Sequence, residues 1–199
     1  MSRKLIYGVG INDADYDVHE CANVSGKWKN IWRCPFYKTW TNMLYRCYSE
    51  KAQSKHPTYK SCRVCDEWLV FSNFKAWMET QDWEGKHLDK DVLKGGNKTY
   101  CPEWCIFVDR NINNFVTDRG NYRGEYMIGV SWHKSGCKFV SQCRNPFTHK
   151  NEYLGYFTNE LEAHLAWKSR KHELACLLAD SEYCTDPRLA EALRTRYAN

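Results

Sequence analysis

This sequence lacks the segments that carry proteins into or across membranes. None of its apolar runs approaches the roughly 18 residues that a transmembrane helix requires. Its first twenty residues, Met1 to Glu20, contain no apolar core of the kind found in secretory signal peptides. We therefore expect a cytoplasmic protein, in the cytoplasm of its own cell or of a host cell, with no membrane partner.

Internal repeats and low-complexity tracts are also missing. The 199 residues suffice for one compact domain or two small ones, and a content of 43% hydrophobic and 15% aromatic residues suffices for a packed core. Because the cytoplasm is reducing, the eleven cysteines, an odd number, are expected to be thiols, core fillers or metal ligands rather than disulfides.

The positive charge of the chain is concentrated in one segment. The formal net charge is +5, and residues 119–150 alone reach that value, because one glutamate, Glu125, stands against six basic side chains. These six are Arg119, Arg123, Lys134, Lys138, Arg144 and Lys150. A concentrated basic patch suits a polyanion such as nucleic acid. An ordinary solvated surface is the alternative explanation.

Periodicity in the first half of the chain predicts short elements. Apolar residues recur at helical spacing from Phe36 to Cys47, Ser72 is placed to cap a second helix, and the glycine pair at 95–96 marks a turn between two strands. The predicted elements are irregular strands within 1–35, a helix at 36–49, a polar loop at 50–61, a helix at 72–80, a β-hairpin at 86–108 and a helix at 110–116.

The second half is predicted to follow a polar, glycine-containing linker at 117–124. Asn159 and Asp186 are placed to cap two helices, the second of which has a proline at its first position. The predicted elements are strands at 126–133, 137–144 and 151–157 and helices at 160–179 and 187–197. The apolar stripe of the first helix would consist of Leu161, Leu165, Leu174 and Leu178. The chain is thus expected to be α+β, with domains at 1–120 and 121–199.

The predicted strand at 137–144 separates polar from apolar side chains, because successive side chains of a strand point to opposite faces. One face carries Lys138, Val140, Gln142 and Arg144, and the other carries Phe139, Ser141 and Cys143. On the neighbouring strands, Ser131 shares a face with His133, and Asn151 shares a face with Tyr153. Arginine and glutamine have donor arrangements that can read the edges of guanine and adenine. The polar face is therefore a candidate DNA-binding surface.

Four segments in this region resemble the ethylene-response-factor (Apetala-two type) DNA-binding domain of plants, which also occurs in nucleases of phages and mobile elements. They are 129–132 (GVSW), 138–144 (KFVSQCR), 153–158 (YLGYFT) and 162–167 (EAHLAW). The resemblance implies a three-stranded antiparallel sheet packed on one helix, with the sheet in the major groove of double-stranded DNA. From the resemblance, the strand faces and the basic segment together, the expected DNA-binding residues are Arg123, Ser131, His133, Lys134, Lys138, Gln142, Arg144, Asn151 and Tyr153.

The first half resembles the core of HNH nucleases, a β-hairpin followed by a helix that grips one divalent metal ion. The segments concerned are 88–91 (LDKD), 96–98 (GNK), 102–108 (PEWCIFV) and Asn113. Together with 40–48 and 62–68, they make the chain similar to phage proteins usually labelled HNH or homing endonucleases. The resemblance implies a divergent ββα-metal domain with catalytic residues Asp89, Lys90, Asp91 and Asn113, and with Mg²⁺ or Mn²⁺ held by Asp89 and Asn113.

This second resemblance fails at the catalytic base. Lys90 stands where the family has a histidine, and Trp104 stands where it has the orienting asparagine. A lysine with its ordinary pKa near 10 is a poor general base, and His87, the nearby alternative, faces away from Lys90 on an alternating strand. Two interpretations stay open: a slow, metal-dependent DNA endonuclease, or an inactive nuclease scaffold that only binds DNA.

Cys62 and Cys65 form a C-x₂-C pair, the spacing at which two thiolates can hold one zinc ion. Cys47, Cys101 and Cys105 are candidates to complete a structural Zn²⁺ site, with Cys47 and Cys105 preferred. Packed free thiols are the alternative.

A third functional class is an effector that binds a host protein, because the first half is rich in aromatic side chains that commonly supply binding hot spots. These are Trp28, Trp32, Phe36, Tyr37 and Trp40. A structural core would explain the same rings.

Overall fold

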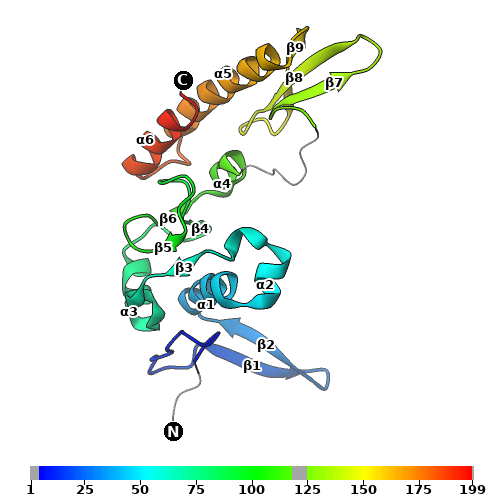
Figure 1. Ribbon diagram of the computed structural model, residues 1–199. Coiled ribbons are helices and arrows are strands. Elements are labelled where there is room, and N and C mark those ends of the chain that lie inside the picture. Colours follow the sequence, from blue (N-terminus) through cyan, green and yellow to red (C-terminus); the bar gives the residue numbers. More distant parts are fainter. Residues whose placement is uncertain (1–4, 118–124, 199) are drawn as a thin grey trace. The chain divides into compact units, whose positions relative to one another are not determined.

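The computed structural model describes residues 5–117 and 125–198 (Figure 1). The chain divides into two compact units, 1–107 and 108–199. Both mix helices with small sheets, in agreement with the expected α+β class. The division falls ahead of helix α4 (Arg110–Val116) and not between 120 and 121, because α4 packs on helices of the second unit. Residues 118–124 of the predicted linker lie outside the described part of the chain.

The first unit is built from short elements (Figure 1). Its strands are β1 (His19–Val24), β2 (Lys27–Arg33), β3 (Arg63–Val64), β4 (His87–Asp89), β5 (Thr99–Tyr100) and β6 (Ile106–Val108), the last of which ends at the division. Its helices are α1 (Pro35–Tyr48), α2 (Glu50–Lys55) and α3 (Phe71–Glu79), with 3₁₀ turns η1 (Pro57–Tyr59) and η2 (Asp66–Leu69). Three separate pairs form: β1 with β2, β3 with β5, and β4 with β6.

Helix α1 supplies the centre of the first unit's core. Trp40, Met43, Leu44 and Cys47 recur at the spacing of one helix face, and none is more than 2% exposed. A buried indole N–H needs an acceptor, and Trp40 Nε1 donates to the carbonyl oxygen of Trp68 at 2.7 Å. The predicted helix at 36–49 and its buried stripe are therefore confirmed.

The structure corrects three local predictions in this unit. Residues 50–61, predicted as loop, contain α2 and η1. Ser72 does not cap α3, which begins one residue earlier; its hydroxyl and its backbone N–H donate instead to the carboxylate of Asp13, at 2.5 and 2.9 Å. The predicted hairpin at 86–108 pairs only its two ends, because β5 within it pairs in parallel with β3.

The second unit contains one larger sheet (Figure 1). Its elements are α4, β7 (Val130–His133), β8 (Lys138–Arg144), β9 (Asn151–Phe157), α5 (Glu160–Ala179) and α6 (Pro187–Arg196). The three strands pair antiparallel in the order β7-β8-β9, and β7 starts at Val130 and not at residue 126. Asn159 caps α5 through Leu161 N and Glu162 N, and Asp186 caps α6 through Arg188 N.

The sheet packs one of its faces on α5. The buried side of the helix consists of Ala163, Trp167, Leu174, Ala175, Leu178 and Ala179. The predicted stripe is half wrong, because Leu161 and Leu165 are 53% and 49% exposed. Each precedes a buried residue by two positions, which places it about 200° away around the helix. Neither α5 nor any other helix in the described residues has the length and apolar character that crossing a membrane needs.

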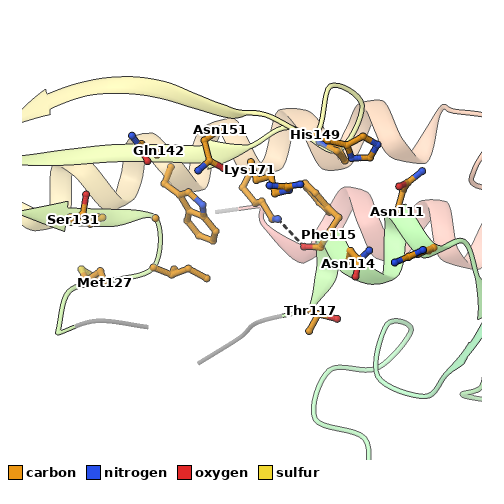
Figure 2. A pocket seen from close by; sticks show the side chains of 17 residues that line it. Asn111, Asn114, Phe115, Thr117, Met127, Ser131, Gln142, His149, Asn151 and Lys171 are labelled. Atoms are coloured by element: carbon orange, nitrogen blue, oxygen red, sulfur yellow. Dashed lines mark hydrogen bonds between the residues drawn. The ribbon is translucent and has the colours of Figure 1, made fainter. Parts of the chain in front are cut away.

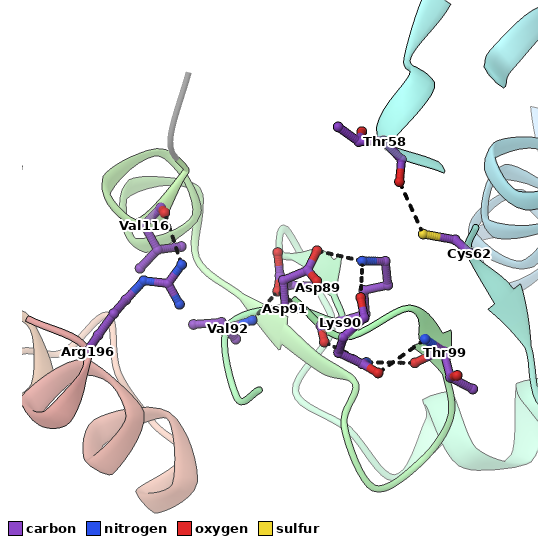
Figure 3. Close-up of polar contacts among 10 residues, drawn as sticks. Thr58, Cys62, Asp89, Lys90, Asp91, Val92, Thr99, Val116 and Arg196 are labelled. Atoms are coloured by element: carbon purple, nitrogen blue, oxygen red, sulfur yellow. Dashed lines mark hydrogen bonds and ion pairs between the residues drawn. The ribbon is translucent and has the colours of Figure 1, made fainter. Parts of the chain in front are cut away.

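Two hydrogen bonds hold α4 to the C-terminal helices. Lys171 Nζ on α5 donates to the carbonyl oxygen of Phe115 at 2.8 Å. Arg196 Nη2 on α6 donates to the carbonyl oxygen of Val116 at 3.4 Å (Figure 3). Because the last carbonyls of a helix have no partner within it, these two cations satisfy backbone groups at the end of α4.

The close approach of sheet and helix predicts that Gly129→Ala is strongly destabilising. Gly129 has a φ of +82°, and a Cβ at this position would lie 2.1 Å from Trp167 Cγ. Left-handed strain and overpacking together should lower the free energy of unfolding by about 2–4 kcal/mol, measured by urea denaturation of the full chain. Gly95→Ala is the control, because its Cβ would meet open space. Equal stability of the two variants would contradict the packing described.

Candidate nucleic-acid interface

The face of the β7-β8-β9 sheet that α5 does not cover gathers polar side chains from all three strands. Cross-strand partners share a face, and the register pairs Ser131 with Val140, His133 with Lys138, and Arg144 with Asn151. The nine residues of this open face are Ser131, His133, Lys138, Val140, Gln142, Arg144, Asn151, Tyr153 and Tyr156. The face assignment made from strand alternation therefore agrees with the register.

Burial along β8 follows the same alternation. Gln142 and Arg144 are exposed, whereas Ser141 and Cys143 between them are buried against the helix side. Val140 is the exception, since it lies on the open face and is only 8% exposed. Its cross-strand partner Tyr156 is a large side chain on the same face, so the centre of the open face has a small apolar patch surrounded by polar groups.

A bulge in β9 adds a residue that strand alternation missed. The pairing passes from Ser141–Gly155 to Gln142–Tyr153 and skips Leu154. The shift turns Tyr156 to the face of Tyr153, although strict alternation would separate the two rings. Gly155, at φ +133°, provides the signal that could have revealed it, because a glycine inside a strand often marks a bulge.

The two tyrosines form an exposed aromatic cluster with a histidine. The Tyr153 and Tyr156 rings are 5.5 Å apart, and the His133 ring is 5.2 Å from that of Tyr156. Tyr153 and Tyr156 are 55% and 51% exposed. Exposed rings beside amides and cations can make both apolar and hydrogen-bonding contacts with a ligand.

Acidic side chains are missing from the open face. The three strands contain one carboxylate, Glu152, and its cross-strand partner is Cys143 on the helix side. Glu152 accepts hydrogen bonds from Arg170 Nε and Nη2 on α5, at 2.7 and 3.2 Å, and from Asn145 Nδ2 at 2.6 Å. These hydrogen bonds lower the pKa of Glu152 to about 2. The cations Lys138 and Arg144 therefore meet no acidic neighbour on the open face.

The same cluster holds the turn between β8 and β9. The Asn145 side-chain oxygen accepts from the backbone N–H groups of Phe147 and Thr148, and Asn145 N donates to the carbonyl oxygen of Lys150 at 2.9 Å. Arg144 and Asn151, which flank this turn, are thereby fixed opposite each other. Of the remaining predicted DNA-binding residues, Lys134 is exposed in the β7–β8 turn, and Arg123 lies outside the described residues.

Three of the four residues expected to catalyse hydrolysis, Asp89, Lys90 and Asp91, are engaged in hydrogen bonds of the 89–99 loop (Figure 3). Asp89 Oδ1 accepts from the backbone N–H groups of Asp91 and Val92, both at 2.7 Å. Lys90 is 4% exposed, and its Nζ donates to Asp91 Oδ2 at 2.6 Å and to the carbonyl oxygen of Asn97 at 2.7 Å. These contacts give Asp89 and Lys90 a structural role in the loop.

The predicted divalent-metal site has no further support from the described residues. Asp89 belongs to the first unit, whereas Asn113, on α4, belongs to the second. Among residues 5–117 and 125–198, no group of three or more histidine, cysteine, aspartate or glutamate side chains is arranged to hold a metal ion. Metal binding by Asp89, Asp91 and Asn113 stays a prediction.

The cysteines considered as zinc ligands are spread between two places in the first unit's core. All eleven cysteines of the chain are free thiols. Cys47 lies near Cys62, and burial raises the pKa of Cys47 to about 12. Cys105 lies near Cys101 and Cys65, and burial raises its pKa as well. Zinc binds thiolates, and zinc binding by these cysteines stays a prediction beside the packed-thiol alternative.

The aromatic residues considered as binding hot spots divide into core residues and exposed ones, and Phe36 is partly buried against the core. Tyr37 and Trp40 are 9% and 0% exposed and belong to the core. Trp28 and Trp32, on β2, are 75% and 43% exposed.

The position of Glu152 predicts a pH-dependent contribution to stability. Its folded-state pKa of about 2 lies below the ordinary 4.5, so the stabilisation is complete above pH 4.5 and disappears as the pH falls towards 2. Glu152→Gln should lower the free energy of unfolding by about 1 kcal/mol at pH 7 and by less at pH 3. Glu173→Gln, which removes the more exposed partner of Arg170, is the control in the same urea titrations. A Glu152→Gln effect that does not change with pH would refute this assignment.

Comparison with known proteins finds no relative: no family model matches the chain, and neither the search of curated proteins nor that of solved structures gives a match. Its function must therefore be argued from its own residues.

Proposed function

We propose that the chain binds double-stranded DNA through the open face of the β7-β8-β9 sheet. The observation that carries this proposal is the composition of that face: two cations, two amides, two exposed tyrosines and no carboxylate on three adjoining strands. Nucleic-acid interfaces combine positive charge with donors that reach base edges and phosphates.

The length of β8 suits a strand that runs along the major groove. This groove is about 12 Å wide and admits a two-stranded ribbon. From Lys138 to Arg144, β8 extends for roughly 20 Å at the usual rise per residue. The strand can therefore follow the groove while its open face meets base edges.

The chemistry of each side chain suits it either to a base edge or to a phosphate. Arg144 and Gln142 can each make bidentate hydrogen bonds, to guanine and to adenine respectively. Lys138, a point charge at the beginning of β8, suits a phosphate. Asn151 lies directly opposite Arg144 and can extend the same readout. The resemblance of this region to the ethylene-response-factor domain supports this use of a sheet.

Metal-dependent DNA cleavage is the second candidate function. One observation favours it: β4 and β6 pair with each other, and α4 follows β6 in the chain, which is the strand–strand–helix order of the HNH resemblance. The buried, hydrogen-bonded Lys90 argues against a fast reaction, because it is not placed to take a proton from water.

Binding to a host protein is the alternative to cleavage for the first unit. The observation in its favour is the exposure of Trp28 and of Ile31, which is 59% exposed, on β2. Large exposed aromatic side chains are typical of binding hot spots.

The DNA-binding proposal predicts that the Lys138→Ala/Gln142→Ala/Arg144→Ala variant loses duplex affinity. Arg144→Ala alone should weaken binding by about 1–3 kcal/mol, and Lys138→Ala should reduce the salt slope by about 1. Fluorescence anisotropy with a labelled duplex at several salt concentrations measures both effects.

The control for this experiment is Lys51→Ala/Lys55→Ala, which removes the same number of positive charges from the exposed side of α2. Unchanged affinity of the triple variant would show that DNA, if bound, docks elsewhere. An equal loss in the α2 variant would show that only net charge matters.

The cleavage candidate is tested with Asp89→Asn. This change removes the negative charge that a metal would need but keeps an oxygen for the backbone N–H groups of Asp91 and Val92. We expect at most slow nicking of supercoiled DNA by the wild type with Mg²⁺ or Mn²⁺, none by the variant, and equal duplex affinity for both. Asp66→Asn, at an exposed position of η2, is the control. Efficient cleavage by Asp89→Asn would show that the active site lies elsewhere. If the wild type does not cleave DNA, DNA binding without cleavage would be the remaining proposal.

A further inference from the structure

A cleft of about 940 Å³ lies beside the open face, within the second unit (Figure 2). It is bounded by α4, by the segment leading into β7, by β8 and β9 and by α5. Four of its lining residues, Ser131, Gln142, Arg144 and Asn151, also belong to the open face. The cleft and the sheet surface are thus continuous.

The charge of the cleft selects an anion. Arg110, Arg144 and Lys171 line it, His149 adds an imidazole ring, and no aspartate or glutamate is among the lining residues that the structure describes. Lys171 is held in place by its bond to the carbonyl oxygen of Phe115, and its Nζ lies 3.4 Å from the centre of the Phe115 ring. Burial lowers the pKa of Lys171 to about 8, with nearby Arg196 acting in the same direction. A bound phosphate would offset both effects.

The rest of the lining suits a nucleobase. Asn111 and Asn114 from α4 stand on the other side of the cleft from Gln142 and Asn151 (Figure 2). Amide side chains both donate and accept, as hydrogen bonding to a base edge requires. Met127, which is 39% exposed, and the indole of Trp167 provide apolar surface for the flat face of a ring.

Together these features point to an unpaired nucleotide, and we propose that the cleft binds a nucleotide displaced from DNA held on the open face. Phosphate would meet the cations, and the base would meet the amides and the apolar wall. A paired base is stacked within the duplex and cannot present its face and edge to such a cleft, so the nucleotide must leave the stack. This inference rests on the proposed function.

The test compares two labelled duplexes that differ by one bulged nucleotide, 2-aminopurine, with the full-length protein. We expect roughly ten-fold tighter binding of the bulged duplex, together with a change in 2-aminopurine fluorescence on binding. Asn114→Asp, a nearly isosteric change at an exposed position of α4, puts a carboxylate in the cleft. It should remove the preference and the fluorescence change but leave the affinity for the paired duplex intact. Arg110→Ala should act in the same direction.

Two control variants carry the same chemical changes outside the cleft: Asn42→Asp on α1 and Arg188→Ala on α6, both at exposed positions. Both should behave as the wild type. Equal binding of the two duplexes by the wild type, or equal losses on both duplexes in Asn114→Asp, would overturn the inference and leave the proposed function standing.

Competition with free dAMP and with inorganic phosphate tests whether the cleft binds a nucleotide within DNA, a free nucleotide or phosphate alone. The proposal expects neither to displace the bulged duplex at equal concentration. Binding of free dAMP that is sensitive to Asn114→Asp, without binding of any duplex, would overturn both the link to DNA and the proposed function. Failure to bind any of the probes would overturn both as well.

Discussion

The second unit depends on the burial of one sheet face against α5. An antiparallel sheet that is covered on one side leaves its other side to solvent, so the helix decides which side chains remain available for binding. Gly129 allows this packing, because any Cβ there would meet the Trp167 ring. Phe139 and Cys143 lie on the covered face, and Lys138 and Arg144 lie on the open one. The candidate interface is therefore a consequence of the core.

Features that depend on local periodicity could be predicted from the sequence. The alternation of Ser141, Gln142 and Cys143 in burial needs only the two-residue period of a strand. The caps at Asn159 and Asp186 need only a short polar side chain ahead of a helix. Most of the proposed interface could be predicted in this way, because its residues on β8 follow the alternation of a single strand.

Features that depend on distant partners could not be predicted. The sequence indicates that Ser72 is a helix cap. In the structure its hydroxyl and N–H donate instead to the carboxylate of Asp13, 59 residues away in the chain. Lys90 stands at the sequence position of the family's catalytic base. In the structure it is buried, and its ammonium donates to the carbonyl oxygen of Asn97. Tyr156 reaches the open face only because β9 bulges at Leu154. The cleft is formed by α4, which belongs with the second unit because of its contacts to Lys171 and Arg196.

The charged side chains of the second unit are distributed unevenly between the open face and the helices. Residues 151–199 carry a net charge of −2, and apart from Glu152 their carboxylates lie on α5, on α6 or in the segments beside these helices. Glu152 itself is turned to Arg170. The sheet thus presents two cations and no carboxylate on its open face, whereas the carboxylates of α5 and α6 stand among the six lysine and arginine side chains of residues 151–199. A polyanion approaching such a unit is attracted to the open face. The charge of this face therefore supports the proposed orientation on DNA independently of the groups that could read base edges.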